Sequence, residues 1–326
     1  MTVIVSVKIN DGIVMASDSA STFTNTQVYD HAEKIVNLVK GLPIGAMATG
    51  DGGIGSESLT TLLKDLGKRL ADKQDSMYLD PSSYTMADVA GRVHQFLFAE
   101  KSMPSGGTAN ILLRVCGYSA GRPLPEVWQV QLQGAISYQL LLVHAETNFG
   151  INWDGQYDAL NRLVLGVPTD LEQWATDWGM HQTDAHNLGA AIRQRAQETL
   201  AIPTMPIQDA IDLARYLVEV TMGFIKFSIG KQPKTVGGTI EKLQSMRGFV
   251  GFSVSNFIQL ALMNRERYGC LLHRNVTHNT APRVSSAACC RDSHHAWRSK
   301  PIIEDCEGRR WFHEVSQLPP ISTTAS

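Results

Sequence analysis

The feature that most constrains the fold is a pair of hairpin patterns within the first fifty residues. The stretch 3–9 is apolar at every other position, Asn10-Asp11-Gly12 supplies residues that tolerate the backbone angles of a tight turn, and 13–18 returns antiparallel. Residues 34–39 and 44–49 repeat this pattern around a turn at 40–43. The sequence therefore predicts that the chain begins with two antiparallel hairpins.

Further along, strands and helices alternate in blocks. Apolar residues at helical spacing predict helices over 56–73, 86–98, 185–199 and 207–227. Between the two helix pairs we expect strands over 109–117, 126–132 and 135–142, separated by turns that contain Gly or Pro. This order predicts an α+β fold in which two antiparallel sheets lie between helical layers, a four-layer α/β/β/α sandwich.

Composition excludes several classes of protein. A chain of 326 residues with 29 Lys and Arg against 31 Asp and Glu has the profile of a globular domain and lacks the basic excess of a nucleic-acid binder. Its apolar runs are shorter than the ~20 residues that a membrane helix requires. A chain of this size needs no disulfide or metal to hold its core, and nothing at its start resembles a secretion signal. We therefore predict a cytoplasmic protein without cofactor, metal, nucleic-acid or membrane partner.

From about residue 249 the composition changes. The segment 249–326 holds four of the five Cys and five of the ten His, with little periodicity. The adjacent Cys289-Cys290 pair and the lack of a Cys-x-x-Cys motif are not typical of a zinc site. We interpret 1–248 as one domain and 249–326 as an atypical Cys- and His-containing tail, either an appendage, a disordered segment or a non-native C-terminus introduced by a frameshift.

Hairpin geometry brings four polar groups toward one rim. In the first hairpin, residues whose numbers sum to about 21 face each other, so Thr2 lies beside Asp18. In the second hairpin the sum is about 83, which places Lys34 opposite Thr49 and next to Gly50. If the two hairpins are adjacent and antiparallel, all these residues meet at the same end of the sheet.

These residue types suit nucleophilic catalysis. Removal of Met1, expected because Thr2 is small, exposes a threonine whose own α-amine can accept the hydroxyl proton. A Lys34 ammonium favours loss of that proton, and Asp18 holds Lys34 in place. Gly50 can present a backbone N–H to the developing oxyanion without a side chain in the way. The alternative interpretation is an ordinary surface ion pair beside a frayed terminus.

Taken together, these segments resemble the N-terminal half of the proteasome β-subunit family. The similarity rests on Thr2 and the following strand, on residues 11–18 (DGIVMASD), 33–35 (EKI) and 48–50 (ATG), and on an ungapped spacing from Thr to Asp to Lys. It extends to about Glu241, where residues 235–240 (TVGGTI) are similar to the family's Ser-Gly-Gly strand.

The resemblance implies an N-terminal-nucleophile (Ntn) hydrolase fold for residues 1–248 and a threonine-type endopeptidase that hydrolyses peptide bonds inside a homo-oligomeric ring. It implies Thr2 as nucleophile and base, Lys34 as the group that lowers the nucleophile's pKa, Asp18 as the residue that orients Lys34, and Gly50 as the oxyanion donor. It also implies peptide or unfolded protein as substrate and an ATPase unfoldase as a candidate partner.

The sequence departs from the family at several supporting positions. Ser19-Ala20 stands where the family has an Arg, and the family's later Asp and Ser correspond to Pro233 and Val236. No Ser occurs at Gly155-Gln156, near the family's Gly-Ser segment. These departures keep two alternatives open: a non-catalytic ring subunit of the same fold, and an amidohydrolase that acts on small amides.

Two other motifs compete for a function. Residues 117–121 (GYSAG) fit the G-x-S-x-G pattern of serine hydrolases, but an extended stretch and no helix follows them, so we predict a hairpin turn. Residues 50–55 (GDGGIG) fit the dinucleotide-binding pattern G-x-G-x-x-G, but the strand before them belongs to a hairpin, which favours a tight strand-to-helix junction. We expect His94 and His144 to be structural.

Overall fold

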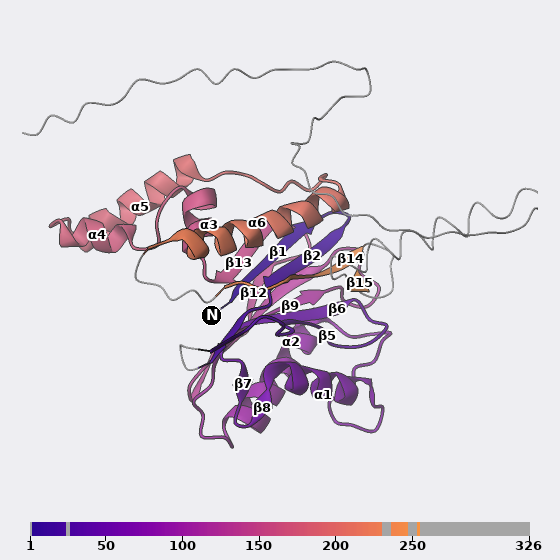
Figure 1. Ribbon diagram of the computed structural model, residues 1–326. Helices are drawn as coiled ribbons and strands as arrows, with labels where there is room; N and C mark the ends of the chain where they lie inside the picture. The colour runs from indigo at the N-terminus through magenta and orange to yellow at the C-terminus, as the bar shows by residue number, and fades with distance from the viewer. Residues whose placement is uncertain (1, 24–26, 230–235, 247–252, 255–326) are drawn as a thin grey trace, which may run out of the picture. The chain divides into compact units, whose positions relative to one another are not determined.

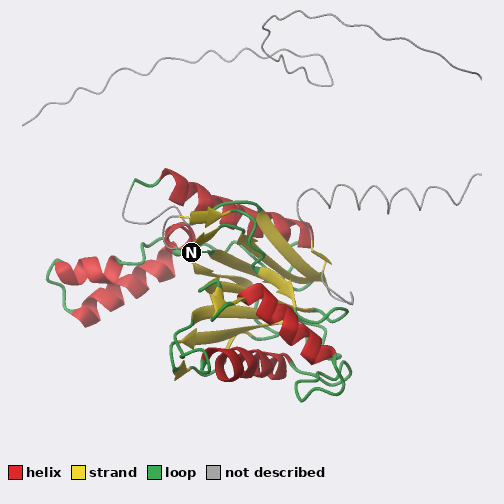
Figure 2. Ribbon diagram, turned by 60° about the horizontal axis from the view of Figure 1, so that its bottom comes forward, coloured by secondary structure: helices red, strands yellow, loops and turns green. Residues whose placement is uncertain are grey.

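The computed structural model describes residues 2–23, 27–229, 236–246 and 253–254. These residues form two antiparallel sheets stacked face to face, with helices on both outer sides (Figures 1 and 2). The first sheet has the strand order β13 (Gly150–Gly155), β1 (Val3–Ile9), β2 (Gly12–Asp18), β14 (Ile240–Met246), β15 (Ser253–Val254). The second has the order β11 (Ile136–Ser137), β10 (Glu126–Gln133), β9 (Asn110–Gly117), β6 (Ile44–Gly50), β5 (Ile35–Asn37), and β12 (Leu141–His144) also pairs with β10.

Helices cover the outer face of each sheet. On the second sheet lie α1 (Leu59–Ala71), α2 (Met86–His94) and the π-helical segment η1 (Gln95–Ser102). On the side of the first sheet lie α3 (Asp158–Leu160), the π-helical segment η2 (Asn161–Leu165), α4 (Leu171–Asp177), α5 (Gln182–Ala196) and α6 (Ile207–Phe227). Two small hairpins, β3 (Ser21–Phe23) with β4 (Gln27–Tyr29) and β7 (Gly53–Ile54) with β8 (Glu57–Ser58), complete the described elements.

The hydrophobic core has three layers, one at each interface of this sandwich. One cluster joins α1, α2 and η1 to the second sheet, one joins the two sheets, and one joins α6 and α3 to the first sheet. This arrangement confirms the predicted α+β architecture with two antiparallel sheets between helical layers. In the described part of the chain, no helix is both long enough and apolar enough to cross a membrane.

Alternation along β1 explains why this strand is buried on both faces. Val3, Val5, Val7 and Ile9 belong to the cluster under α6, whereas Ile4 belongs to the cluster between the sheets. In α1 the predicted stripe of leucines is buried, and Ser58 caps the helix by accepting a hydrogen bond from the Thr61 backbone N–H. The helix therefore begins at Leu59 rather than at residue 56 as predicted.

Part of the layer between the sheets is polar. Ser6 and Lys8, on the face of β1 opposite to Val5 and Val7, are each 1% exposed. Arg114 of β9 forms an ion pair with Asp154 of β13 across the two sheets, with an N–O distance of 2.5 Å. This pair links β9 of the second sheet to β13 of the first.

The predicted register is correct in the first hairpin and wrong in the second. In the first, Ile4 pairs with Ser17, so the predicted sum of 21 is confirmed. In the second hairpin Ile35 pairs with Met47, so the numbers of paired residues sum to 82. Lys34 is therefore opposite Ala48, and its predicted pairing with Thr49 is wrong by one residue. The hairpins also lie in different sheets, and it is the stacking of the sheets that brings their ends together.

Other elements were missed or divided. The predicted strand 135–142 is wrong as a single unit, because its pairing with β10 shifts register and separates β11 from β12. Strand β13, which pairs with β1, and helix α4 were not predicted. The tail 249–326 lies outside the described residues except for Ser253 and Val254.

Candidate active site

A cavity of about 630 Å³ opens at the end of the sheets where β1 begins and β6 ends. Three of the four predicted catalytic residues, Thr2, Lys34 and Gly50, line it. Its other walls come from the β3–β4 hairpin, from the segment before β5, and from the start of α1. The fourth predicted residue, Asp18, lies directly behind Lys34. The structure therefore brings together all four residues that the hairpin patterns had placed at one rim.

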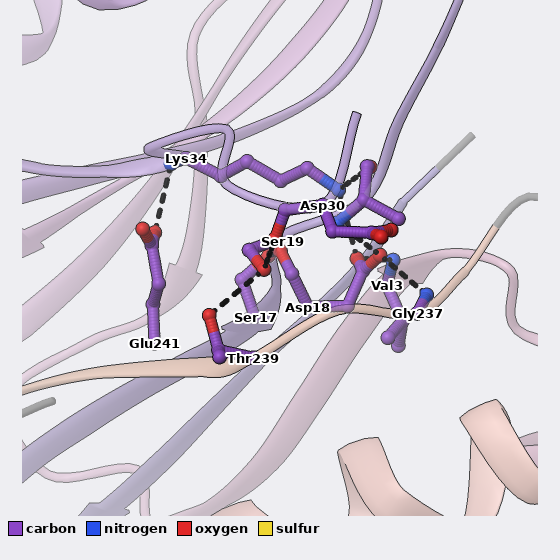
Figure 3. A network of polar contacts seen from close by, with 10 residues as sticks. Val3, Ser17, Asp18, Ser19, Asp30, Lys34, Gly237, Thr239 and Glu241 are labelled. Atoms are coloured by element: carbon purple, nitrogen blue, oxygen red, sulfur yellow. Dashed lines mark hydrogen bonds and ion pairs between the residues drawn. The ribbon is translucent and has the colours of Figure 1, made fainter. Parts of the chain in front are cut away.

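Asp18 is the centre of a polar network (Figure 3). Its Oδ1 accepts hydrogen bonds from Lys34 Nζ and from the Val3 backbone N–H, both at 3.0 Å. Its Oδ2 accepts from the backbone N–H groups of Ala20 and Gly237, at 3.2 and 3.1 Å. Lys34 Nζ also donates to the carbonyl oxygen of Ala20. One carboxylate oxygen thus joins the lysine ammonium to the main chain of the residue after Thr2.

Burial shifts the protonation of this pair. The Asp18 side chain is fully buried and that of Lys34 is 9% exposed. Burial lowers the pKa of Lys34 from its ordinary value, while the charges of Asp18 and Glu241 oppose this shift. Burial likewise raises the pKa of Asp18, against the effect of Lys34 and of the backbone donors.

Thr2 is held by main-chain contacts on both sides. It is 6% exposed, and its carbonyl oxygen accepts a hydrogen bond from the Gln156 backbone N–H at 2.8 Å. Gly155 has a φ of +86°, and a Cβ built there would lie 1.9 Å from the same carbonyl oxygen. Glycine at position 155 thus lets β13 approach Thr2 closely. The position of Thr2 depends on β13 as well as on Asp18.

Gly50 ends β6 in a conformation that favours glycine. Its φ is +103°, and a Cβ at this position would lie 2.3 Å from the carbonyl oxygen of Asn110. The next N–H, that of Asp51, donates to the same carbonyl at 2.9 Å. Position 50 therefore requires glycine where the main chain of β6 reaches the cavity.

The two competing motifs have structural roles. Residues 117–121 form the connection between the antiparallel strands β9 and β10, and Ser119 Oγ accepts a hydrogen bond from the Met86 N–H at the start of α2. Residues 50–55 connect β6 to the small β7–β8 hairpin, and β6 pairs antiparallel with both of its neighbours. Neither segment has the context that its catalytic or nucleotide-binding interpretation requires.

Metal-binding geometry is not found in the described part of the chain, where no three His, Cys, Asp or Glu side chains are placed to hold an ion. Every His and Cys of the predicted tail, from Cys270 to His313, lies outside the described residues. His94 stacks on Phe98 with ring centres 5.2 Å apart, and burial lowers its pKa. His144 pairs with Val127 across two strands, and burial lowers its pKa as well.

Several residues at the site were missed. Gly237 donates to Asp18, Glu241 accepts from the Lys34 backbone N–H, and Gly155 with Gln156 contacts Thr2. The glycine pair at 237–238 is a signal for a close approach, but its partner cannot be inferred from spacing, because Gly237 and Asp18 are 219 residues apart. No local pattern distinguishes Glu241 from other glutamates.

No family model and no curated protein matches the chain. Among solved structures, the chain is similar to Anbu from Hyphomicrobium sp. strain MC1, with 12% identity over 85% of this chain and 100% of that one and a TM-score of 0.48. It is also similar to the helical assembly of the Anbu complex from Pseudomonas aeruginosa, with 15% identity over 85% and 98% of the two chains and a TM-score of 0.46. A third similar structure is Anbu, an ancestral β-subunit, from Yersinia bercovieri, with 12% identity over 86% and 100% and a TM-score of 0.49.

Proposed function

We propose that the protein is a threonine hydrolase of the Ntn type that cleaves peptide bonds with Thr2 as nucleophile. The observation that carries this proposal is the sharing of Asp18 Oδ1 between Lys34 Nζ and the Val3 N–H, beside a cavity that Thr2 and Lys34 both line. This contact supports a lysine ammonium close to the Thr2 main chain, in a site where burial strengthens electrostatic effects.

The proposed reaction proceeds by acyl transfer. After removal of Met1, the α-amine of Thr2 accepts the hydroxyl proton while Oγ attacks the substrate carbonyl carbon. The C–N bond then breaks, the leaving amine takes the proton, and the acyl group remains on Oγ as an ester. Water hydrolyses this ester, releases the carboxylic acid and restores the hydroxyl. No external oxidant, metal or cofactor is needed to balance these steps.

Each remaining residue has a separate role in this proposal. Lys34 stabilises negative charge on Oγ as the proton leaves, and its position is fixed by Asp18. The main chain at Gly50 is the candidate donor to the oxyanion of the tetrahedral intermediate. Gly155 and Gln156 hold the carbonyl of Thr2, which orients the nucleophile toward the cavity.

The substrate we propose is a peptide or unfolded polypeptide, and the working form is a homo-oligomeric ring. A nucleophile at an open sheet rim requires neighbouring subunits to restrict access to it. An ATPase unfoldase is a candidate partner of such a ring. The two alternatives, a non-catalytic ring subunit and a small-amide hydrolase, share the fold and are separated by experiment.

The test is the intact mass and N-terminal sequence of the purified full chain before and after incubation with a β-lactone probe. We expect a chain that begins at Thr2 and gains the whole mass of the lactone, because the opened ring stays on Oγ as an ester. Thr2→Ser keeps a hydroxyl and should still be labelled, whereas Thr2→Ala should not. Fluorogenic peptides and small amides then distinguish the two kinds of hydrolase.

Three outcomes would overturn the proposal. The first two are a chain that retains Met1 and a chain that begins at Thr2 but is not labelled. Either result favours the non-catalytic subunit. Labelling of Thr2→Ala at the wild-type rate would show that another residue is the nucleophile.

A further inference from the structure

Glu241 lies on β14, next to the residue that pairs with Asp18. Ile240 is opposite Asp18 and Glu241 is opposite Ser17 in the β2–β14 register. The Glu241 side chain reaches out of its own sheet toward the start of β5, where its Oε2 accepts a hydrogen bond from the Lys34 backbone N–H at 2.8 Å. The Ile35 backbone N–H donates to the same carboxylate. Figure 3 shows Glu241 at the main-chain end of Lys34 and Asp18 at its ammonium end.

The position of β5 explains why an acceptor is needed there. β5 is the edge strand of the second sheet and pairs only with β6 among the described strands. The N–H groups on its free side have no strand partner, and buried N–H groups without an acceptor cost free energy. Glu241 supplies this acceptor to the Ile35 N–H, and it also accepts from the N–H of Lys34, which immediately precedes β5 and whose carbonyl oxygen accepts from the Ala48 N–H of β6.

The same segment of chain also fixes Asp18. Gly237, four residues before Glu241, donates its N–H to Asp18 Oδ2 at 3.1 Å. Residues 237–241 therefore hold both members of the ion pair: Gly237 contacts the carboxylate, and Glu241 contacts the backbone from which the lysine extends. A lysine side chain is flexible but of limited length, so its ammonium reaches Asp18 only while its main chain is held within that length.

We propose that Glu241 is a positioning residue for the threonine hydrolase, which holds the Lys34 backbone so that the ammonium reaches Asp18 and Thr2. This inference rests on the proposed function for its effect on rate. Its effect on Lys34 itself is independent of whether Thr2 reacts.

Three carboxylates surround Lys34, and only one of them binds its ammonium. Asp18 binds Nζ, Glu241 binds the backbone N–H, and Glu33 precedes Lys34 in the chain and is paired with Lys64 at 2.5 Å. Burial raises the pKa of Glu241, and the Lys34 charge opposes that shift. Loss of the Glu241 charge therefore lowers the pKa of Lys34, because one stabilising charge is removed.

Two variants separate the hydrogen bond from the charge. Glu241→Gln keeps an oxygen that accepts from the Lys34 N–H but carries no charge. Glu241→Ala removes both. Glu219→Ala is the matched control, because Glu219 is an exposed glutamate on α6 whose side chain lies 3.8 Å from Arg215. Thermal unfolding of all three full-length proteins shows whether each remains folded.

Two measurements are made on each protein. The first is the rate of Thr2 acylation by a β-lactone as a function of pH. The second is the NMR titration of Lys34 in protein labelled with ¹³C at the lysine ε-carbon, assigned with Lys34→Arg. We expect Glu241→Ala to lose about tenfold to a hundredfold in rate, the loss that misplacement of a reacting group produces. We expect Glu241→Gln to retain most of the rate, with a lower Lys34 titration midpoint and with the Lys34-dependent limb of the pH profile shifted to lower pH.

A Glu241→Ala rate equal to that of Glu219→Ala, or a Lys34 midpoint that is the same in Glu241→Ala as in the wild type, would overturn the inference. If the wild-type protein is not acylated at all, the proposed function fails. In that case the NMR titration still decides whether Glu241 acts on Lys34.

Discussion

Two buried lysines lie at opposite ends of the β1–β2 hairpin, and their surroundings differ. Lys34 contacts the Asp18 carboxylate at the end where Thr2 lies. Lys8, near the other end of β1, donates to the backbone carbonyl oxygens of Ala145 and Glu146 and lies 5.3 Å from the centre of the Phe149 ring. Lys8 is 1% exposed and does not line the cavity.

The comparison shows that burial alone does not identify a catalytic lysine. Burial lowers the pKa of both, that of Lys8 to about 8, so the direction of the shift does not separate them. What separates them is access to a cavity and a shared carboxylate that connects Lys34 to the Val3 backbone N–H, next to Thr2. A pKa shift is a signal of function only together with such geometry.

The largest expected effect distinguishes the two lysines directly. Lys34→Ala should reduce the rate of Thr2 acylation on the order of a thousandfold, the scale seen when one member of a catalytic unit is removed. Lys8→Met should leave the rate close to that of the wild type, because Lys8 does not face the cavity. The measurement is intact mass against time with a β-lactone. Equal losses in both variants would contradict the distinction.

Asp18→Asn should affect stability as well as rate. The Asp18 carboxylate accepts hydrogen bonds from four donors, two at each oxygen. In asparagine an NH₂ group replaces one of these oxygens and cannot accept a hydrogen bond, so two donors lose their acceptor. Because the change also leaves the Lys34 ammonium buried without its counterion, we expect a loss of about 3–5 kcal/mol in the free energy of unfolding. Urea unfolding measures this loss. A variant as stable as the wild type would show that the network contributes little to the fold.

The two ends of β6 extend the comparison to glycines. Gly50→Ala should cost about 3 kcal/mol, because the alanine adopts a positive φ and meets the Asn110 carbonyl oxygen. Gly41→Ala, in the turn before β6, should cost about 1 kcal/mol, since its φ of +89° is strained but no atom lies within 4 Å of the added Cβ. Thermal unfolding compares the two, and equal costs would rule out the close contact at Gly50.

The last effect is the pH dependence that Lys8 gives to stability. Its pKa is about 8 in the folded protein, against 10.5 in an unfolded chain, mainly because of burial. Between pH 8 and pH 10.5 the Lys8 side chain is protonated in the unfolded chain but largely unprotonated in the folded protein. Because the unfolded chain binds more protons, the free energy of unfolding rises with pH in this range. The stability of the wild type relative to Lys8→Met should therefore increase from pH 8 to 10.5 in urea titrations. A constant difference would place the Lys8 pKa outside this range.

Local patterns predicted those parts of the fold that depend on local pairing. The register of β1 with β2 followed from a short turn and strict alternation, and α6 has the bounds that its apolar spacing predicted. The predicted register of β5 with β6 was wrong by one residue. The turn that contains Gly41 is closed by a hydrogen bond from the Leu42 N–H to the Val39 carbonyl oxygen, which the sequence pattern did not reveal. In a strand such a slip moves every side chain to the other face.

The supporting residues of the site could not be predicted in this way. Register within each hairpin placed Thr2 near Asp18 and Lys34 near Gly50, whereas the two pairs meet because the sheets that hold them stack. Gly155, Gly237 and Glu241 come from β13, from the loop before β14 and from β14 itself, whose pairing with β1 and β2 is set by tertiary packing. Sequence spacing carries no information about contacts of this range.

The late position of β14 in the chain has a consequence for biosynthesis. Thr2, the proposed nucleophile, is made 235 residues before Gly237, and Gly237 and Glu241 hold the Asp18–Lys34 pair. Until β14 pairs with β2, Asp18 lacks one donor and Lys34 lacks its backbone anchor. A partly synthesised chain therefore carries an incomplete site, and the proposed hydrolysis requires that β14 has paired with β2.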